Sequence, residues 1–412
     1  MNRFEDFTTR IVQQVGKKEG PISPVMVNSA SFGYGDSETG EGIFEGSIKK
    51  PLYARVGNPT SAQLEQVLAS MDGGIGAVSA STGMGAIAMA TLSLLRAGDE
   101  IISIGGLFGG TYSYFSETLP RFGISTKFFD VDALIEVENA ITSETKVIFL
   151  ESVGNPNMRL PDIATIAQIA NAHGVALIVD NTTTPMSVLP LLLGADIVVY
   201  STTKIITGNA SALGGAVVYR PIAEGEDKFK SERYRDIQPF IQKMGAMALI
   251  AVAKKRALRD FGMSANGFGS YLTMLGLETL PLRMDRIVTT IESVAGKLSE
   301  AGFVVNHPCL ADHPHHERYK TQFANGCGTI FTIDLGSKEK AFEFLNRSKL
   351  ITITANIGDS RTLGLHMAST IYRDFDDATK AFLGITPGLV RISIGLESAY
   401  AIIDDFISAS KI

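Results

Sequence analysis

The chain has 412 residues, 45% of them hydrophobic and 19% charged, so it is long enough to bury a large core spread over two or three domains. Its formal net charge of −6, without a basic block, argues against a nucleic-acid partner. Two cysteines, Cys309 and Cys327, indicate a reducing compartment, and neither an apolar signal region nor a membrane-length apolar run is present in the sequence. We therefore expect a soluble, cytoplasmic protein with no membrane association.

Residues 1–60 are punctuated by glycine and proline and predict an extended arm, not a folded unit. Within it, Tyr53 and Arg55 lie on one side of an extended segment, and the Asn-Pro-Thr that follows marks a turn and a helix start. The segment is either a plain surface arm or a carrier for Arg55, whose planar guanidinium suits phosphate. Such an arm is long enough to reach a neighbouring subunit.

Strand and helix patterns alternate over residues 61–262, which predicts an α/β fold with a mostly parallel, doubly wound sheet. The expected strands are 77–79, 100–104, 126–129, 146–150, 175–179, 197–200 and 216–219. The expected helices between them are 85–95, 112–121, 162–172 and 186–193.

Several of these strands end in segments able to bind a ligand. Gly83 and Met84 stand between a strand and a helix, where backbone amides bind phosphate. Phe108, in a glycine-rich segment, packs either on a flat ring or on the core. Asn155 ends the next strand, where its amide serves a ligand or a turn. The convergence of such strand ends is typical of a binding site.

Lys204 follows the apolar strand 197–200, and Asp180 ends the apolar strand before it. If the two strands are neighbours, an amine and a carboxylate meet at the carboxyl edge of the sheet, where α/β proteins bind ligands. Pyridoxal phosphate (PLP) requires that pair, because a lysine forms the Schiff base and an aspartate keeps the pyridine nitrogen protonated. A solvated lysine at a strand end is the alternative, but the hydroxyls of Ser201 and Thr203 beside it suit a phosphate.

Residues 263–412 predict a smaller α+β domain. A long helical pattern over 271–297 precedes expected strands at 329–334, 351–355 and 390–394. Arg391 lies inside an apolar alternating strand and needs an anionic partner, either a substrate carboxylate or a structural Asp or Glu. The histidines of the segment 313–316 lack the cysteine or carboxylate pattern of a metal site, so we assign no metal.

Taken together and in order, the motifs resemble the Cys/Met-metabolism family of PLP enzymes over nearly the whole chain. They are Tyr-x-Arg-x-x-Asn-Pro-Thr, Thr-Gly-Met, Phe-Gly-Gly-Thr-Tyr, Asn-Pro, Asp-Asn-Thr, Ser-x-Thr-Lys and Arg-Ile-Ser-x-Gly-Leu-Glu. The resemblance implies PLP fold type I, the aspartate-aminotransferase-like fold. It also implies a homotetramer built from two tight dimers, with active sites shared across the dimer interface.

The resemblance also implies roles for individual residues. Lys204 would carry the Schiff base, Asp180 would face the pyridine nitrogen, Phe108 would stack on the ring and Asn155 would lie near its hydroxyl. The phosphate would be held by a set from two subunits: Gly83, Met84, Ser201 and Thr203, with Tyr53 and Arg55 of the adjacent subunit. Arg391 would bind the amino-acid carboxylate in a pocket lined by Thr362.

Phe108 departs from the family pattern, which usually has a tyrosine with a proton-transfer role. That role would pass to Lys204, Tyr53 or water. Gly110 stands where methionine γ-lyases tend to carry a cysteine.

Within the family the motifs are most similar to the O-acetylhomoserine sulfhydrylases. The implied reaction is γ-replacement on O-acetyl-L-homoserine, giving homocysteine and acetate in methionine biosynthesis. Methionine γ-lyase or cystathionine γ-synthase chemistry is the alternative. The residues identify neither the acyl group nor the sulfur donor, which is free sulfide, a small thiol or a sulfur-carrier protein. A binding module without catalysis is the third reading, and uptake of PLP by the purified protein separates it from the other two.

Overall fold

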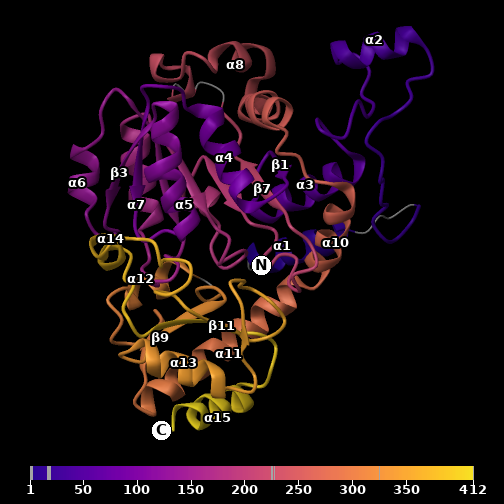
Figure 1. Ribbon diagram of the computed structural model, residues 1–412. Coiled ribbons are helices and arrows are strands. Elements are labelled where there is room, and N and C mark those ends of the chain that lie inside the picture. Colours follow the sequence, from indigo (N-terminus) through magenta and orange to yellow (C-terminus); the bar gives the residue numbers. More distant parts are fainter. Residues whose placement is uncertain (1–2, 16–19, 224–225, 227, 324, 412) are drawn as a thin grey trace.

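The computed structural model describes residues 3–15, 20–223, 226, 228–323 and 325–411 and contains two β-sheets with helices around them (Figure 1). The larger sheet has the strand order β1-β7-β6-β5-β4-β2-β3. Its strands are β1 (Gly76–Ala80), β2 (Glu100–Ile104), β3 (Ser125–Phe129), β4 (Thr145–Glu151), β5 (Ala176–Asp180), β6 (Ile197–Tyr200) and β7 (Gly215–Tyr219). The two pairs that β7 makes, with β1 and with β6, are antiparallel and the other strand pairs are parallel, so the predicted mostly parallel sheet is confirmed.

The larger sheet is buried on both faces, as its apolar strands require. In β4, Val147 and Phe149 belong to one hydrophobic cluster, while Ile148 and Leu150 belong to another. The first cluster includes residues of α4 (Gly83–Leu94) and α9 (Ala248–Ala253), and the second includes residues of α7 (Ile163–Ala172). The short helices α5 (Gly109–Ser113), α6 (Leu134–Asn139) and α8 (Gln238–Met244) complete this part of the chain.

The smaller sheet lies in the C-terminal part of the chain and has the order β10-β11-β12-β9-β8. Its strands are β8 (Val304–Asn306), β9 (Ile330–Asp334), β10 (Thr352–Ile353), β11 (Leu363–His366) and β12 (Leu389–Ser393). The accompanying helices are α10 (Gly267–Glu278), α11 (Leu280–Glu300), α12 (His316–Gln322), α13 (Lys338–Arg347), α14 (Asp377–Phe382) and α15 (Ala399–Ser410).

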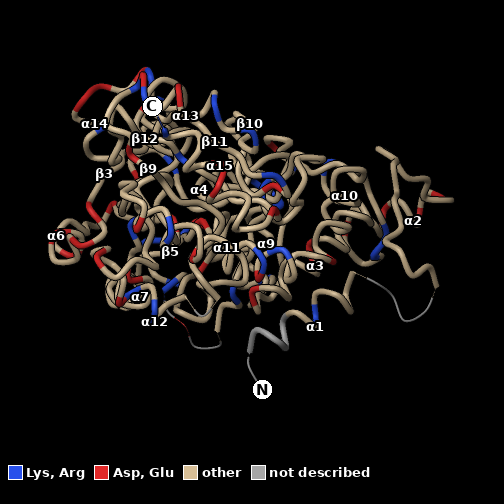
Figure 2. The backbone as a smooth tube through the Cα atoms, turned by 90° about the horizontal axis from the view of Figure 1, so that it is seen from below, with Lys and Arg blue, Asp and Glu red and all other residues tan. Residues whose placement is uncertain are grey.

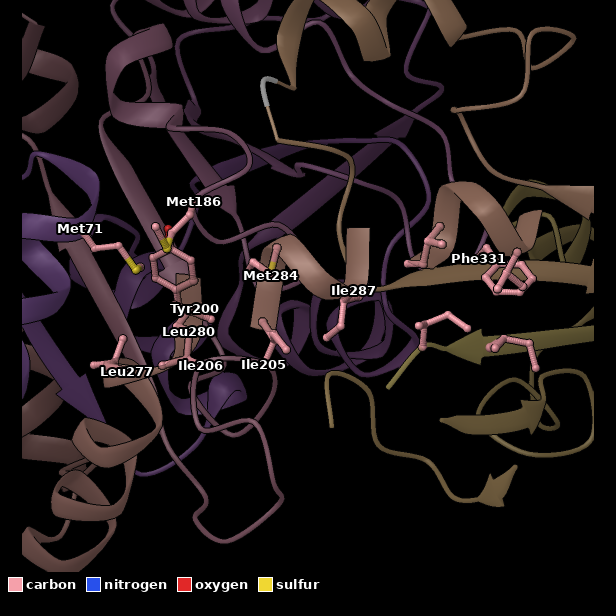
Figure 3. Close-up of a cluster of buried hydrophobic side chains, with 14 of the residues drawn as sticks. Met71, Met186, Tyr200, Ile205, Ile206, Leu277, Leu280, Met284, Ile287 and Phe331 are labelled. Carbon is pink, nitrogen blue, oxygen red and sulfur yellow. The ribbon is translucent and has the colours of Figure 1, made fainter. Parts of the chain in front are cut away.

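One hydrophobic cluster joins the two parts of the molecule (Figure 3). It runs from Met71 on α3 (Pro59–Asp72) and Tyr200 on β6 through Leu277 on α10 and Ile287 on α11 to Phe331 on β9. A shared core of this kind holds the two sheets in a fixed relation. The surfaces that face each other between the sheets are therefore rigidly placed.

The N-terminal segment differs from the wholly extended arm that the sequence predicts. Residues Arg3–Val15 form helix α1, which packs on α3 and α10 and buries Ile11 and Val15 in the core. These two residues are one helical turn apart, which is the spacing of an amphipathic helix on a core. The later part of the segment does extend from the body and carries helix α2 (Ser37–Glu45) at its far end (Figure 1).

Three other predicted elements are corrected. The helix expected at 186–193 is reduced to a 3₁₀ turn over Pro190–Leu193, because its proline lies inside the segment. The single helix expected over 271–297 is two helices that meet at Thr279, two residues before Pro281. The strand expected at 351–355 is only the two residues of β10.

The described helices include none that is long and apolar enough to span a membrane. Lysines and arginines are interspersed with aspartates and glutamates along the chain, and neither sign gathers on one face in the view of Figure 2.

Candidate active site

A cavity lies at the carboxyl ends of β4, β5 and β6, and residues of the smaller sheet close it. Lys204, Asp180 and Arg391 all line it, although Arg391 is far from the other two in sequence. Gly83, Met84, Phe108, Asn155, Ser201 and Thr203 line it as well. The structure thus brings nine of the sequence-predicted site residues together at the carboxyl edge of a parallel sheet.

Lys204 stands in the turn after β6, and its Nζ donates a hydrogen bond to Oδ1 of Asn356 at 2.8 Å. Burial, and secondly the positive charge of Arg391, lower the pKa of the Lys204 amine from 10.5 to about 8. A larger fraction of this amine is therefore uncharged near neutral pH than for an exposed lysine. An uncharged amine is the form that attacks a carbonyl.

Asp180 is the last residue of β5, and its Oδ1 accepts a hydrogen bond from the backbone N–H of Thr182 at 2.9 Å. Burial raises the pKa of its carboxyl group to about 6, while hydrogen bonds from Thr182 oppose the rise. Glu151, at the end of β4, pairs with Asp180 in register and lines the same cavity. A buried carboxylate in this position favours a cationic partner such as a protonated ring nitrogen.

The N-terminus of α4 points into the cavity wall. Thr82 caps this helix by accepting a hydrogen bond from the N–H of Gly85 at 2.9 Å, and Gly83 and Met84 form its first residues. A Cβ atom on Gly83 would lie 2.5 Å from Cβ of Ser201, so only glycine lets the helix end approach the Lys204 turn. Free amides at a helix N-terminus with a serine beside them form an anion site.

The hydroxyl of Thr203 is engaged within the protein. Its Oγ1 donates to the carbonyl of Gly214 at 3.0 Å and accepts from the N–H of Gly214 at 2.9 Å. Thr203 therefore ties the Lys204 turn to Gly214, directly before β7. The neighbouring Thr182, which the sequence analysis did not select, accepts from the N–H of Ser201 at 2.8 Å and fixes the same turn.

Arg391 is buried, and among the described residues its guanidinium contacts only uncharged oxygens. Nη1 donates to Oδ1 of Asn155 at 3.1 Å, and Nη2 lies near the carbonyls of Ala355 and Asn356 at 3.3 and 3.4 Å. Burial lowers the pKa of Arg391 to about 10. Of the two partners that the sequence left open, a structural Asp or Glu within ion-pair distance is not found in the described part of the chain. A carboxylate ligand therefore suits this cation.

Phe108 lies in the loop between β2 and α5 and lines the cavity with its ring. A Cβ atom on Gly110 would lie 2.7 Å from a ring carbon of Phe108. The glycine at this position therefore makes room for the ring, and a cysteine would displace it.

Three predicted site residues do not line this cavity. Tyr53 is 44% exposed, and Arg55 donates to the carbonyl of Arg259 on the outside of the body. Thr362 is fully buried, and its hydroxyl donates to Oε2 of Glu397 at 2.9 Å. Thr362 supports the segment before β11 instead of facing the cavity.

Sequence reasoning missed Glu151, Asn356 and Tyr372 as site residues. Glu151 was visible as a charged residue at a strand end, whereas Asn356 and Tyr372 reach the site only through the packing of the smaller sheet. The histidine segment has a structural role: His315 accepts the N–H of Leu160 at 2.9 Å and contacts Asp132 at 3.1 Å. No group of metal-capable side chains occurs among the residues the structure describes.

Comparisons with known proteins point to one family over nearly the whole chain. The family model for Cys/Met metabolism PLP-dependent enzymes matches residues 8–411. The chain is 36% identical to O-acetyl-L-homoserine sulfhydrylase 1 of Thermus thermophilus (96% of this chain, 94% of that protein). It is 34% identical to a homocysteine synthase of Schizosaccharomyces pombe (93% and 92%). It is also 33% identical to an O-succinylhomoserine sulfhydrylase of Mycobacterium tuberculosis (92% and 89%).

A solved structure from Campylobacter jejuni, described as a putative O-acetylhomoserine (thiol)-lyase, superposes with a TM-score of 0.93 at 31% identity. The match covers 98% of this chain and 99% of that one. That structure carries N′-pyridoxyl-lysine-5′-monophosphate at position 205 of its own chain.

Proposed function

The chain belongs to the Cys/Met metabolism family of PLP-dependent enzymes, and from this premise we propose that it is an O-acetylhomoserine sulfhydrylase. The reaction is γ-replacement on O-acetyl-L-homoserine, in which sulfide takes the place of acetate and homocysteine forms for methionine biosynthesis. The observation that carries the proposal is one cavity containing an amine of lowered pKa, a buried carboxylate, a helix N-terminus and an arginine with no carboxylate partner among the described residues.

The charges of these residues and their positions along the wall of the cavity fit PLP. Lys204 would hold the cofactor covalently, Asp180 would keep a proton on its ring nitrogen, and Phe108 would stack on its ring. The amide nitrogen of Asn155 is available for the ring hydroxyl, because its oxygen accepts from Arg391. The helix end at Gly83 and Met84, together with Ser201, would bind the phosphate, and Thr203 supports that turn.

When bound, PLP supplies an electron sink that stabilises negative charge at the substrate α-carbon. Arg391 binds the substrate carboxylate and so orients the Cα–H bond. The free amine of Lys204 would take the substrate α-proton as general base and return it later. A second proton leaves the β-carbon, and the electrons of that C–H bond expel acetate from the γ-carbon. The sulfur nucleophile then forms the C–S bond at the γ-carbon, and protons return to the β- and α-carbons.

Two features of the cavity favour a short, uncharged ester over the alternatives. Lys204 and Arg391 are the cations among its described lining residues, and both are engaged in the proposed mechanism, so none remains for the extra charge of a succinyl or phosphoryl group. Phe108 has no hydroxyl to protonate a departing thiolate. Acetate needs no proton to leave, whereas the thiolate that a methionine γ-lyase expels from methionine does.

The direct test supplies the purified protein with O-acetyl-L-homoserine and sulfide, with O-succinyl-L-homoserine and sulfide, or with methionine alone. The proposal expects homocysteine from the first mixture at the highest kcat/KM. If methionine alone yields 2-oxobutyrate and methanethiol faster than the first mixture yields homocysteine, the protein is a methionine γ-lyase. Repeating the first arm with a thiocarboxylated carrier protein identifies the sulfur donor.

We further propose a homotetramer in the cytoplasm in which the N-terminal arm of one subunit completes the site of its neighbour. Tyr53 and Arg55 lie outside the cavity of their own chain, and the arm exposes Ile22 and Phe44 at 81% and 70%. Exposed apolar side chains on an extended segment suit burial against another subunit. In this arrangement the proposed domains are the arm (1–60), the cofactor domain (61–262) and the C-terminal domain (263–412).

A further inference from the structure

Glu151 is a buried carboxyl group that the proposed mechanism does not use. It ends β4, and its parallel pairing with Asp180 on β5 places both side chains on the same face of the sheet. Both residues line the active-site cavity. Two carboxyl groups therefore stand next to each other where the cofactor ring is proposed to bind.

The two oxygens of Glu151 accept backbone N–H groups from two different loops. Oε1 accepts from Phe108, in the loop between β2 and α5, at 2.7 Å. Oε2 accepts from Asn155, in the loop after β4, at 3.2 Å. These are the two loops that would place one residue over the cofactor ring and another at its hydroxyl.

Tyr372 joins the same two loops through their carbonyl groups. Its hydroxyl donates to the carbonyl of Asn155 at 3.0 Å and lies 3.3 Å from the carbonyl of Leu107. Tyr372 is fully buried and comes from the segment after β11, in the C-terminal part of the chain. Each loop is thus held twice, by Glu151 at an N–H and by Tyr372 at a carbonyl.

The surroundings of Glu151 favour its uncharged form. Burial, and secondly Asp180, raise the pKa of Glu151 well above its usual range, and the two N–H bonds oppose this only in part. Tyr372 is the other titratable group beside it, and Lys204 and Arg391 line the same cavity. Two adjacent buried carboxylates repel each other, so the proton stays on Glu151 and the charge on Asp180.

We propose that Glu151 and Tyr372 are positioning residues that clip the Phe108 loop to the Asn155 loop, with Glu151 acting as the uncharged partner of Asp180. The inference rests on the proposed function only in taking PLP as the cofactor. It does not depend on which ester or sulfur donor the enzyme uses.

The first test measures the dissociation constant of PLP on the full chain by absorbance titration after cofactor removal. Glu151→Leu leaves two buried N–H groups without an acceptor and is expected to raise this constant at least about tenfold. Glu151→Gln keeps one acceptor and is expected to have a smaller effect, and Tyr372→Phe is expected to weaken binding about threefold or more. Glu65→Gln is the matched control, because Glu65 also accepts two hydrogen bonds, from the N–H and hydroxyl of Ser79, but does not line the cavity.

The second test measures Tm of the cofactor-free full chain against pH for wild type and Glu151→Gln. A carboxyl group whose pKa is raised in the folded state binds its proton on folding, so its contribution to stability falls as pH rises. Glutamine does not titrate, so Glu151→Gln lacks this loss of stability. The Tm of the variant minus the Tm of wild type is therefore expected to increase from about pH 5 to pH 9.

A constant Tm difference over this range, or unchanged PLP affinity in Glu151→Gln and Tyr372→Phe, would overturn the inference. Should Glu151→Leu fail to fold, these two milder variants still decide it. The proposed function is tested separately. A protein that makes no homocysteine would still give the PLP titration and the melting curves by which this inference is judged.

Discussion

At the scale of single residues, the chemistry of the site depends on how burial changes the pKa values of its side chains. Lys204 and Arg391 are cations in one cavity, and each makes its hydrogen bonds to uncharged oxygens. The amine loses part of its proton affinity under these conditions, whereas a guanidinium remains charged throughout the physiological range. The Lys204 amine is thus suited to react, and the Arg391 guanidinium is suited to bind an anion.

Replacing Lys204 by alanine is expected to lower kcat at least about 1,000-fold, because the general base and the covalent attachment are both lost. Borohydride trapping followed by peptide mapping should find the reduced cofactor on Lys204 in wild type and nowhere in the variant. Lys127→Ala, a change in a half-exposed lysine outside the cavity, serves as the control. Trapping at another lysine in wild type would contradict the assignment.

Replacing Arg391 by glutamine is expected to raise KM for the amino-acid ester at least about tenfold, through loss of a charge-assisted hydrogen bond. It should also raise the pKa of Lys204, because Arg391 is one of the two causes that lower it. The rate of PLP attachment, measured against pH, should therefore have its midpoint near pH 8 in wild type and higher in the variant. A midpoint that moves down would show that the two cations do not interact as described.

At the scale of elements, the carboxyl ends of the parallel strands and the start of α4 make one surface. Strands β4 and β5 contribute carboxyl side chains, the loop after β4 contributes the amide of Asn155, and the helix contributes backbone donors. Their closeness depends on Gly83, where the helix meets the Lys204 turn. A side chain at this point would separate two elements whose amides are proposed to share a phosphate.

Gly83→Ala is accordingly expected to weaken PLP binding at least about tenfold, because its Cβ would lie 2.5 Å from Cβ of Ser201. Equilibrium titration with PLP measures the effect. Gly296→Ala is the matched control: it lies within α11 with no atom within 4 Å of the added Cβ, so it should bind PLP normally and gain about 0.5–1 kcal/mol in unfolding free energy. Normal PLP affinity in Gly83→Ala would remove the phosphate site from this helix end.

At the scale of the whole molecule, no described residue of the arm lines the cavity of its own chain. Arg55 contacts the outside of its own body, whereas the cavity lies between the two sheets. An arm that extends away from its own body suits exchange between subunits. In the proposed tetramer, one active site would therefore take Lys204 from one chain and Arg55 from its neighbour.

Mixing two inactive variants tests this division. If sites are shared, hybrids of Arg55→Ala and Lys204→Ala contain some sites with both residues intact, and the mixture should recover activity after subunit exchange. Size-exclusion chromatography with light scattering gives the oligomeric state of each sample. If the mixture never exceeds the sum of the separate variants, Arg55 acts within its own chain or not in the site.

The sequence by itself determined the alternating strands of the larger sheet, because buried parallel strands are continuous apolar runs that end in polar residues. For the same reason Asp180 and Lys204 were predictable, since Asp180 directly follows such a run and Lys204 lies in the polar turn after the next one. Sequence also identified Arg391 as a cation in a strand, without settling its partner. It gave no sign of helix α1 as part of the core, because amphipathic spacing over so short a segment is a weak signal.

Only the tertiary structure decided what lies opposite the strand ends. The C-terminal part of the chain brings Arg391 to the cavity, Asn356 to the Lys204 amine and Tyr372 to the carbonyl of Asn155, and these contacts join residues far apart in the chain. Thr362 lies close to Arg391 in the predicted pocket, yet the fold turns it toward Glu397. The local sequence pattern indicates which face of a helix or strand is apolar. Which two elements touch depends on the packing of all the residues between them.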